Sequence, residues 1–296
     1  MIKTPHKEKL LKAIDNQKCK DDIDILREAE NAYFKWISKL DSLTSSGKDR
    51  VLEMTKALNE YKDFVEVELI AKKGSDFIKR QKGQLKLDNS IMEEFLIHLV
   101  NPSIFHSLPD FELETGPQTV FMSLSFRPAS IANLNDKPDV VLKIKDQDFT
   151  IGKTIFYKFS VDSAFDESKT NEGSLFLAIL AAECKMNYDK TMFQESAGTA
   201  SRLKQGCPDS KYYVLVEYLD MEPEDPRLTE IDNVFLLRHA KRLRYEKRNI
   251  YEEVMAQHKD YPIDGEIVCK FVQEIQSFID AVWYDPSGAL KRGSFV

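Results

Sequence analysis

Glu183 and Lys185 have the residue types and the spacing that best suit chemistry. They directly follow an apolar run, residues 175–182, and the alternation of a β-strand puts their side chains on one face and Cys184 on the other. A carboxylate can hold a hard cation, and a neighbouring ammonium can orient an attacking water or stabilise charge on a phosphate. The pair therefore predicts metal-assisted phosphodiester hydrolysis, with Glu183 as a Mg²⁺ ligand.

A Mg²⁺ site usually contains a second carboxylate, so we expect an acidic residue upstream of Glu183. Asp139 is the preferred candidate, because it stands in a Pro-Asp pair at the head of the apolar stretch 140–145. The chain between Asp139 and Glu183 is long, however. Two alternatives therefore stay open: Asp148, which heads the next predicted strand, and Asp162, which follows that strand.

The elements that must position these residues change character near residue 100. The earlier part carries apolar side chains at three- and four-residue steps, which is typical of amphipathic helices, with breaks near Gly47, Gly74 and Pro102. Later segments favour strands over 120–126, 140–145, 149–161, 175–182 and 212–218, and helices over 191–204 and 265–283. This order predicts an α/β fold, a mixed central sheet flanked by helices, with a helical N-terminal region.

Charge is distributed unevenly along the chain. The net charge of −7, taken alone, argues against a nucleic-acid ligand. Basic residues nevertheless gather in 72–86 and 238–248, and local patches decide binding better than the total. Arginine can read guanine edges, and lysine anchors phosphates. In the second run we predict DNA contacts by Arg238, Lys241, Arg242, Arg244, Lys247 and Arg248.

Several other classes of protein lack support in the sequence. No apolar run reaches the ~18 residues that a membrane span needs, and the N-terminus has no apolar core of a secretory signal. The four cysteines are far apart, as expected of reduced thiols. P-loop, nucleophile-elbow, dinucleotide and zinc-histidine motifs are absent. We expect a cytoplasmic protein without a membrane partner.

The order of these motifs resembles the PD-(D/E)XK nucleases, in which a Pro-Asp strand precedes a strand that closes on Glu-x-Lys, then a helix and another strand. Segments 183–195 and 200–204 resemble, more narrowly, the BbvCI-type restriction endonucleases, which use two different subunits to cut an asymmetric site. The stretch 92–96 resembles the glutamate-bearing helix that precedes the sheet, and it adds Glu93 to the candidate catalytic residues.

The resemblance implies a subunit of a type II restriction endonuclease that hydrolyses double-stranded DNA at a specific site. Asp139 and Glu183 would hold Mg²⁺, and Lys185 would position the attacking water. The expected division is a helical N-terminal region, 1–88, and a nuclease core with DNA-recognition elements, 89–296. Because one active site cuts one strand, a second, non-identical subunit is implied, with a homodimer as the competing arrangement. A repair or recombination nuclease and a non-catalytic DNA-binding protein remain alternatives.

Overall fold

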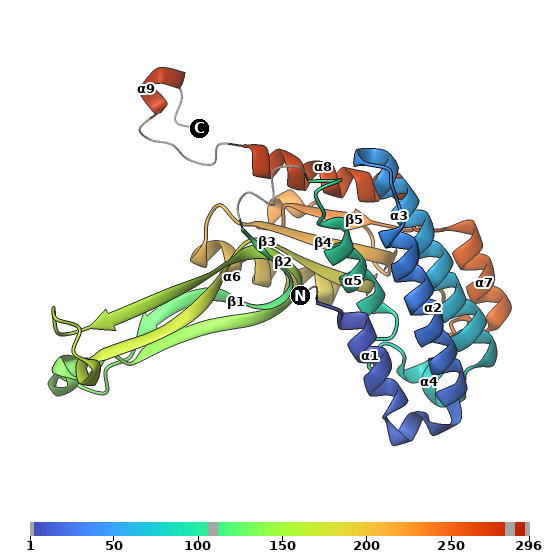
Figure 1. Cartoon of the computed structure of the whole chain (residues 1–296), viewed down its shortest axis with the longest axis horizontal. Coiled ribbons are helices and arrows are strands. Elements are labelled where there is room, and N and C mark those ends of the chain that lie inside the picture. The colour runs from blue at the N-terminus through green and yellow to red at the C-terminus, as the bar shows by residue number, and fades with distance from the viewer. Residues whose placement is uncertain (1–2, 106–111, 282–287, 294–296) are drawn as a thin grey trace.

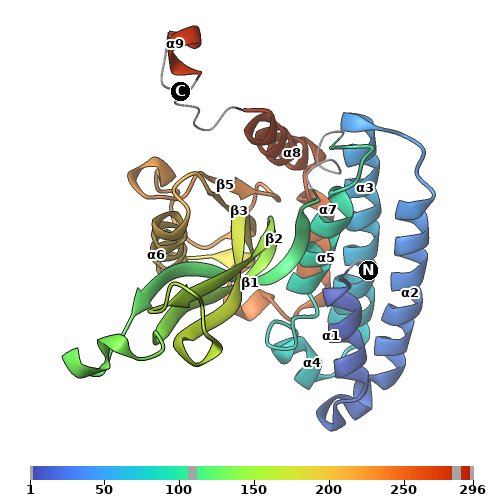
Figure 2. The same cartoon turned by 60° about the vertical axis from the view of Figure 1, so that its left-hand side comes forward.

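A five-stranded β-sheet lies between two sets of helices in the computed structural model, which describes residues 3–105, 112–281 and 288–293. Helix α6 (Lys190–Gly206) covers one face of the sheet. The N-terminal helices and α8 (Gly265–Asp280) cover the other face (Figures 1 and 2). No helix in these ranges is long and apolar enough to cross a membrane. The predicted α/β fold with a mixed sheet is confirmed.

The helices form where the sequence carries its apolar stripes. Helix α2 buries Leu26, Tyr33 and Trp36 on one face. The predicted helix after Gly47 begins as α3 and continues as the π-helical segment Asp63–Ala71 (η2). The remaining α-helices and their bounds are α1 (Pro5–Ile14), α2 (Ile23–Asp41), α3 (Gly47–Lys62), α4 (Asp76–Gln81), α5 (Asn89–Leu99), α7 (Tyr251–Asp260) and α9 (Ala289–Arg292). The end predicted for the last long helix, at 282–283, lies outside the described residues.

The sheet is antiparallel on one side and parallel on the other. Its spatial order is β1-β2-β3-β4-β5, with antiparallel pairs up to β3 and parallel pairs beyond it. Parallel neighbours need a crossover, and α6 supplies it between β3 and β4. The strands are β1 (Glu114–Phe126), β2 (Val140–Ser160), β3 (Thr170–Tyr188), β4 (Lys211–Leu219) and β5 (Asn233–Leu236).

Strand β2 is continuous where the sequence predicted two strands. Its first part pairs with β1 and its second part with β3, and the register shifts at Ile151/Gly152. Glycine is required there, because a Cβ on Gly152 would lie 2.3 Å from the carbonyl oxygen of Leu177. Both ends of β2 therefore reach one distal region, where Lys169 Nζ donates to the carbonyl of Asn135 at 2.9 Å. Residues 123–145 and 153–175 form this projection, which we call the arm (Figure 1).

The apolar core is continuous from the N-terminal helices to the sheet. One cluster joins residues of α2 and α3, such as Trp36 and Leu58, to Phe149 and Tyr213 of the sheet and Phe271 of α8. A second, smaller cluster lies under α6. Burial of apolar area of this kind is the main stabilising contribution to folding. The boundary expected at 88/89 stays a prediction.

Candidate active site

The candidate site lies where β2 and β3 separate. The last ladder pair between the two strands is Phe149 with Ala182. One residue beyond it, Asp148 Oδ2 accepts a hydrogen bond from the backbone N–H of Cys184 at 3.0 Å. The Asp148 carboxylate therefore lies against the backbone of the Glu183-Cys184-Lys185 segment. This contact forms because the two strands stop pairing and leave the Cys184 amide free for a side chain.

A second carboxylate approaches from α5. Glu93 is 3% exposed, and its Oε1 lies 3.3 Å from Lys86 Nζ. The same ammonium lies 3.5 Å from Asp148 Oδ1. Asn89 Nδ2 donates to Glu93 Oε1 at 3.1 Å. Burial, and then the negative charge of Asp148, raise the pKa of Glu93 above its usual value. Glu93 and Asp148 thus repel one another and share one cation.

Glu183 and Lys185 lie on one face of β3, as the alternation predicted. Glu183 is 7% exposed, and its Oε2 accepts a hydrogen bond from Ser196 Oγ of α6 at 2.8 Å. Lys185 Nζ lies 3.6 Å from the same oxygen, and Lys145 Nζ lies 3.8 Å from Oε1. The carboxylate is directed toward α6, and two lysines balance its charge. Burial without such partners would be costly.

A basic cleft of about 600 Å³ opens beside these groups. Asp148 and Lys185 line it together with two segments that are far apart in the sequence, 79–89 and 242–249. Its basic side chains outnumber its three acidic ones, Glu66, Asp88 and Asp148; they are Lys79, Arg80, Lys82, Lys86, Lys185, Arg242 and Arg248. A cleft lined by one sign of charge concentrates ligands of the opposite sign. This cleft therefore suits a polyanion.

The structure does not bring Asp139 or Asp162 to Glu183. Asp139 lies in the arm, where its Oδ2 is 3.8 Å from Arg127 Nε and its side chain is 59% exposed. Neighbouring Pro138 accepts a hydrogen bond from Asn171, and β3 runs from there to Glu183 over on the order of 40 Å. Asp162 caps the turn at the arm's end. Of the three upstream acids considered, Asp148 is the one beside the Glu-x-Lys segment.

The basic run 238–248 is divided between the interior and the surface. Arg238 is fully buried, donating from Nε to Glu217 at 2.8 Å and from Nη1 to the Tyr261 carbonyl at 3.0 Å. Lys62 also contacts Glu217, at 2.8 Å, so this set is an internal ion network. Arg238 cannot reach a DNA phosphate, and its assignment as a DNA contact was wrong. The run 238–248 alone could not show this burial, because the ion-pair partner of Arg238, Glu217, lies on another element, β4.

The other five residues of that run are accessible to different degrees. Arg242 and Arg248 line the cleft, and both lie near Asp220. Lys241 pairs with Glu222, and Lys247 with Glu253. Arg244 is exposed and has no ion-pair partner within the described residues. Lys86 and the segment around Lys79 were not predicted as site residues. The sequence shows that this segment is basic, but only the tertiary structure shows that it lines the same cleft as Asp148.

Glu93 and Asp148 fit a divalent cation, because both carboxylates already accept one shared ammonium. Mg²⁺ commonly binds through one or two carboxylates and keeps waters. No group of three or more His, Cys, Asp or Glu side chains is gathered closely enough to hold a metal ion in the described part of the chain. Glu183, which points toward α6, is thus separate from the pair in this conformation.

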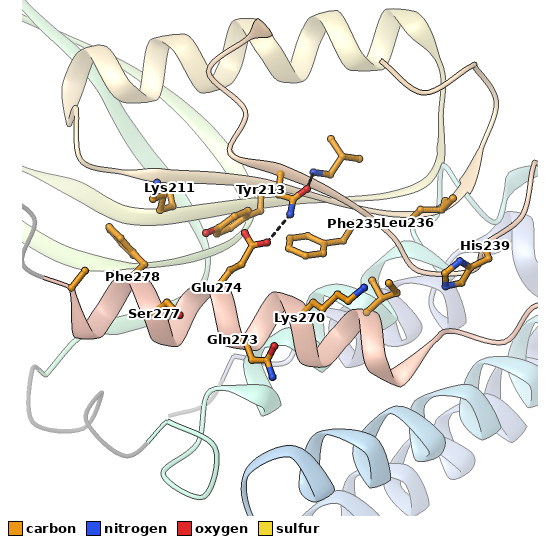
Figure 3. A pocket seen from close by; sticks show the side chains of 14 residues that line it. Lys211, Tyr213, Phe235, Leu236, His239, Lys270, Gln273, Glu274, Ser277 and Phe278 are labelled. Atoms are coloured by element: carbon orange, nitrogen blue, oxygen red, sulfur yellow. Dashed lines mark hydrogen bonds between the residues drawn. The ribbon is translucent and has the colours of Figure 1, made fainter. Parts of the chain in front are cut away.

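A second hollow of about 710 Å³ lies between β5 and α8 (Figure 3). Glu274 is the only carboxylate among its described lining residues, and its Oε1 accepts a hydrogen bond from Asn233 at 2.6 Å. Because this hollow has neither a carboxylate pair nor the Glu-x-Lys segment, it does not suit metal-assisted phosphodiester chemistry. The basic cleft does.

The sheet order, the crossover helix and the Glu-x-Lys strand agree with the arrangement of the PD-(D/E)XK restriction-endonuclease class that the sequence resembles. The chain belongs to the Bpu10I restriction endonuclease family, whose sequence model matches residues 84–295. It is a type II site-specific deoxyribonuclease. A chain of the native BbvCI A2B2 tetramer superposes with a TM-score of 0.65 and 19% sequence identity, covering 93% of this chain and 96% of that one. No curated protein sequence matches the chain.

Proposed function

We propose that this chain is a subunit that hydrolyses one strand of a specific, asymmetric duplex DNA site with Mg²⁺. The observation that carries the proposal is the contact of the Asp148 carboxylate with the backbone of the Glu183-Cys184-Lys185 segment, at the wall of a basic cleft. Asp148 replaces Asp139 as the proposed upstream acid. We also propose that the chain acts in the cytoplasm, as expected from its sequence.

The residues that would hold Mg²⁺ are Asp148 and Glu93. Glu183 is a third acidic residue nearby, and its side chain points toward α6. When bound, Mg²⁺ would supply Lewis acidity to the scissile phosphodiester. Lys185 lines the cleft and can orient the attacking water or neutralise charge that develops on the phosphate. Glu183 pairs with Lys185, and Ser196 of α6 donates to the same Glu183 oxygen. Arg242, Arg248 and the segment around Lys79 can bind flanking phosphates.

The proposal is tested with supercoiled plasmids that together sample many sequences. The purified chain, alone and with the product of a co-expressed neighbouring nuclease gene, is incubated with Mg²⁺ or with EDTA. We expect Mg²⁺-dependent nicking by the chain alone, or discrete linear fragments with its partner, and neither with Glu183→Gln. DNA binding without cleavage in every combination would favour the non-catalytic alternative. Cleavage that follows DNA structure instead of sequence would favour a repair nuclease.

We further propose that the partner is a second, non-identical nuclease subunit. The similar solved protein is an A2B2 tetramer, built from two kinds of chain. This chain offers a surface for such a partner, since the arm exposes large apolar side chains: Phe126, Ile131, Leu134, Ile144, Ile155, Phe156, Val161 and Phe165. Its seven basic and six acidic residues nearly cancel, so the arm has no phosphate track. Exposed apolar patches of this kind mark protein interfaces.

A further inference from the structure

Lys86 occupies the position between the two acids of the proposed metal site. Its ammonium lies 3.3 Å from Glu93 Oε1 and 3.5 Å from Asp148 Oδ1. The Lys86 ammonium is thus a cation in contact with both carboxylates. No other lysine or arginine in the described residues contacts both of them.

The backbone at Lys86 is fixed while its side chain is half exposed. Lys86 has a φ of 55°, in the left-handed region of backbone conformation that residues other than glycine rarely adopt. Its N–H donates to the Gly83 carbonyl at 3.1 Å, and its own carbonyl accepts from the Ser90 amide at 3.3 Å. The side chain is 43% exposed and lines the basic cleft. The ammonium can thus leave the acids by side-chain rotation alone.

We propose that the Lys86 ammonium is a built-in stand-in for the catalytic cation, neutralising Glu93 and Asp148 in the metal-free protein and leaving them when Mg²⁺ binds. This inference rests on the proposed function, because it takes the pair to be the metal site. Two carboxylates facing one another without a cation would repel. The stand-in keeps them assembled, and it competes with Mg²⁺ for the same oxygens. Once displaced, Lys86 faces the cleft, where a DNA phosphate would receive it.

The competition predicts that removing the ammonium strengthens Mg²⁺ binding. Isothermal titration of Mg²⁺ into the DNA-free protein measures this directly. We expect Lys86→Gln to bind Mg²⁺ about three- to tenfold more tightly than the wild type, the effect of losing a partly exposed competing ion pair. Lys86→Arg, which keeps a cation, should resemble the wild type. Lys82→Gln is the matched control, because Lys82 lines the same cleft and contacts neither acid; its Mg²⁺ affinity should be unchanged.

A thermal-unfolding measurement gives a second readout. In EDTA, Lys86→Gln should melt below the wild type, and Mg²⁺ should raise its Tm by more than it raises that of the wild type. Lys86→Asn, which tolerates the left-handed backbone, replaces the Gln variant if that one does not fold. A Mg²⁺ affinity of the neutral variants equal to or weaker than that of the wild type would overturn the inference.

Two further variants separate the failure of this inference from the failure of the proposed site. If Glu93→Gln and Asp148→Asn bind Mg²⁺ as tightly as the wild type, the pair is not the metal site and both ideas fall. If these variants lose Mg²⁺ binding while Lys86→Gln gains none, the metal site stands and Lys86 is a structural ion-pair partner only.

Discussion

At the scale of single residues, the strand separation beyond Phe149 and Ala182 decides which carboxylate meets the Glu-x-Lys segment. Pairing stops there, so Asp148 turns its side chain to the Cys184 amide. Asp139 has the Pro-Asp context expected of the upstream acid, yet it pairs with Arg127 in the arm. The Pro-Asp pair in the sequence therefore favoured Asp139, whereas the backbone geometry brings Asp148 to the Glu-x-Lys segment.

These positions give a clear contrast between two substitutions. We expect Asp148→Asn to lower Mg²⁺-dependent cleavage by at least about 100-fold, because it removes one of the two proposed Mg²⁺ ligands. Asp139→Asn should cleave within about threefold of the wild type, since its exposed side chain takes part only in a surface ion pair. Plasmid cleavage rates measured at saturating enzyme give both values. Loss of activity in Asp139→Asn alone would restore the original assignment.

The internal network around Glu217 shows how far a charged residue can depart from the usual role of its type. Lys62 and Arg238 are both fully buried, and both contact Glu217. Buried ion pairs are tolerated only when their partners are in place. These two cations therefore hold α3 and the segment after β5 against β4.

At the scale of elements, hydrogen bonds of His6 hold α1 against α5, the helix that carries Glu93. His6 of α1 contacts Ser90 Oγ at 2.8 Å and Tyr61 Oη at 2.7 Å, and its amide donates to Glu94 at 2.8 Å. Burial, and then the positive charge of Lys62, lower the pKa of His6 to about 3. The imidazole is therefore neutral in the folded protein, and protonation opposes this packing.

The depressed pKa of His6 links folding to pH. The unfolded chain takes up a proton at His6 below a pH of about 6.5, whereas the folded chain does not until about 3. The stability contributed by neutral His6 is thus complete above 6.5 and declines as the pH falls toward 3. Between pH 7.5 and 5.5, His6→Gln should lose about 1 kcal/mol less unfolding free energy than the wild type.

Urea unfolding at the two pH values measures this difference. Equal losses in His6→Gln and the wild type would show that His6 does not carry the linkage.

At the scale of the whole molecule, the arm and the cleft differ in the chemistry of their surfaces. The cleft gathers basic side chains from two distant segments, whereas the arm is nearly neutral and exposes aromatic and aliphatic groups. Polyanions bind where positive charge is concentrated, and proteins associate where apolar area can be buried. The cleft and the exposed apolar side chains of the arm therefore suit different kinds of partner.

This division predicts the effect of polar substitutions on the arm. Phe156 is 81% exposed and Ile131 is 87% exposed, so changing both to Ser should leave the Tm unchanged. Association with the partner subunit should weaken by at least about tenfold, as expected when buried apolar side chains are lost from an interface. Analytical ultracentrifugation of the mixed subunits measures it. Leu228→Ser is the control, because Leu228 is 86% exposed and lies outside the arm. An undiminished affinity of the double variant would place the interface elsewhere.

The sequence by itself determined the helical N-terminal region, the main strands and helices that follow it, and the strand that carries Glu183 and Lys185. Hydrophobic periodicity and turn residues are local, so they indicate where α5, β3 and α6 lie, and the alternation in β3 puts Glu183 and Lys185 on one face. The segments 183–195 and 200–204 carried the resemblance to the BbvCI-type enzymes, which the family match and the structural match confirm. The predicted helix over 191–204 is α6, and Asp189 caps its start by accepting the Met192 amide at 2.9 Å.

Only the tertiary structure decided which residues meet. The bend in β2 carries Asp139 into the arm and leaves Asp148 beside Cys184, and no local pattern marks where two strands stop pairing. Burial of Arg238 depends on Glu217, and the place of Lys86 depends on α5 and β2 together. Such contacts join residues that are distant in sequence, so they follow from the packing of whole elements and are absent from any short segment.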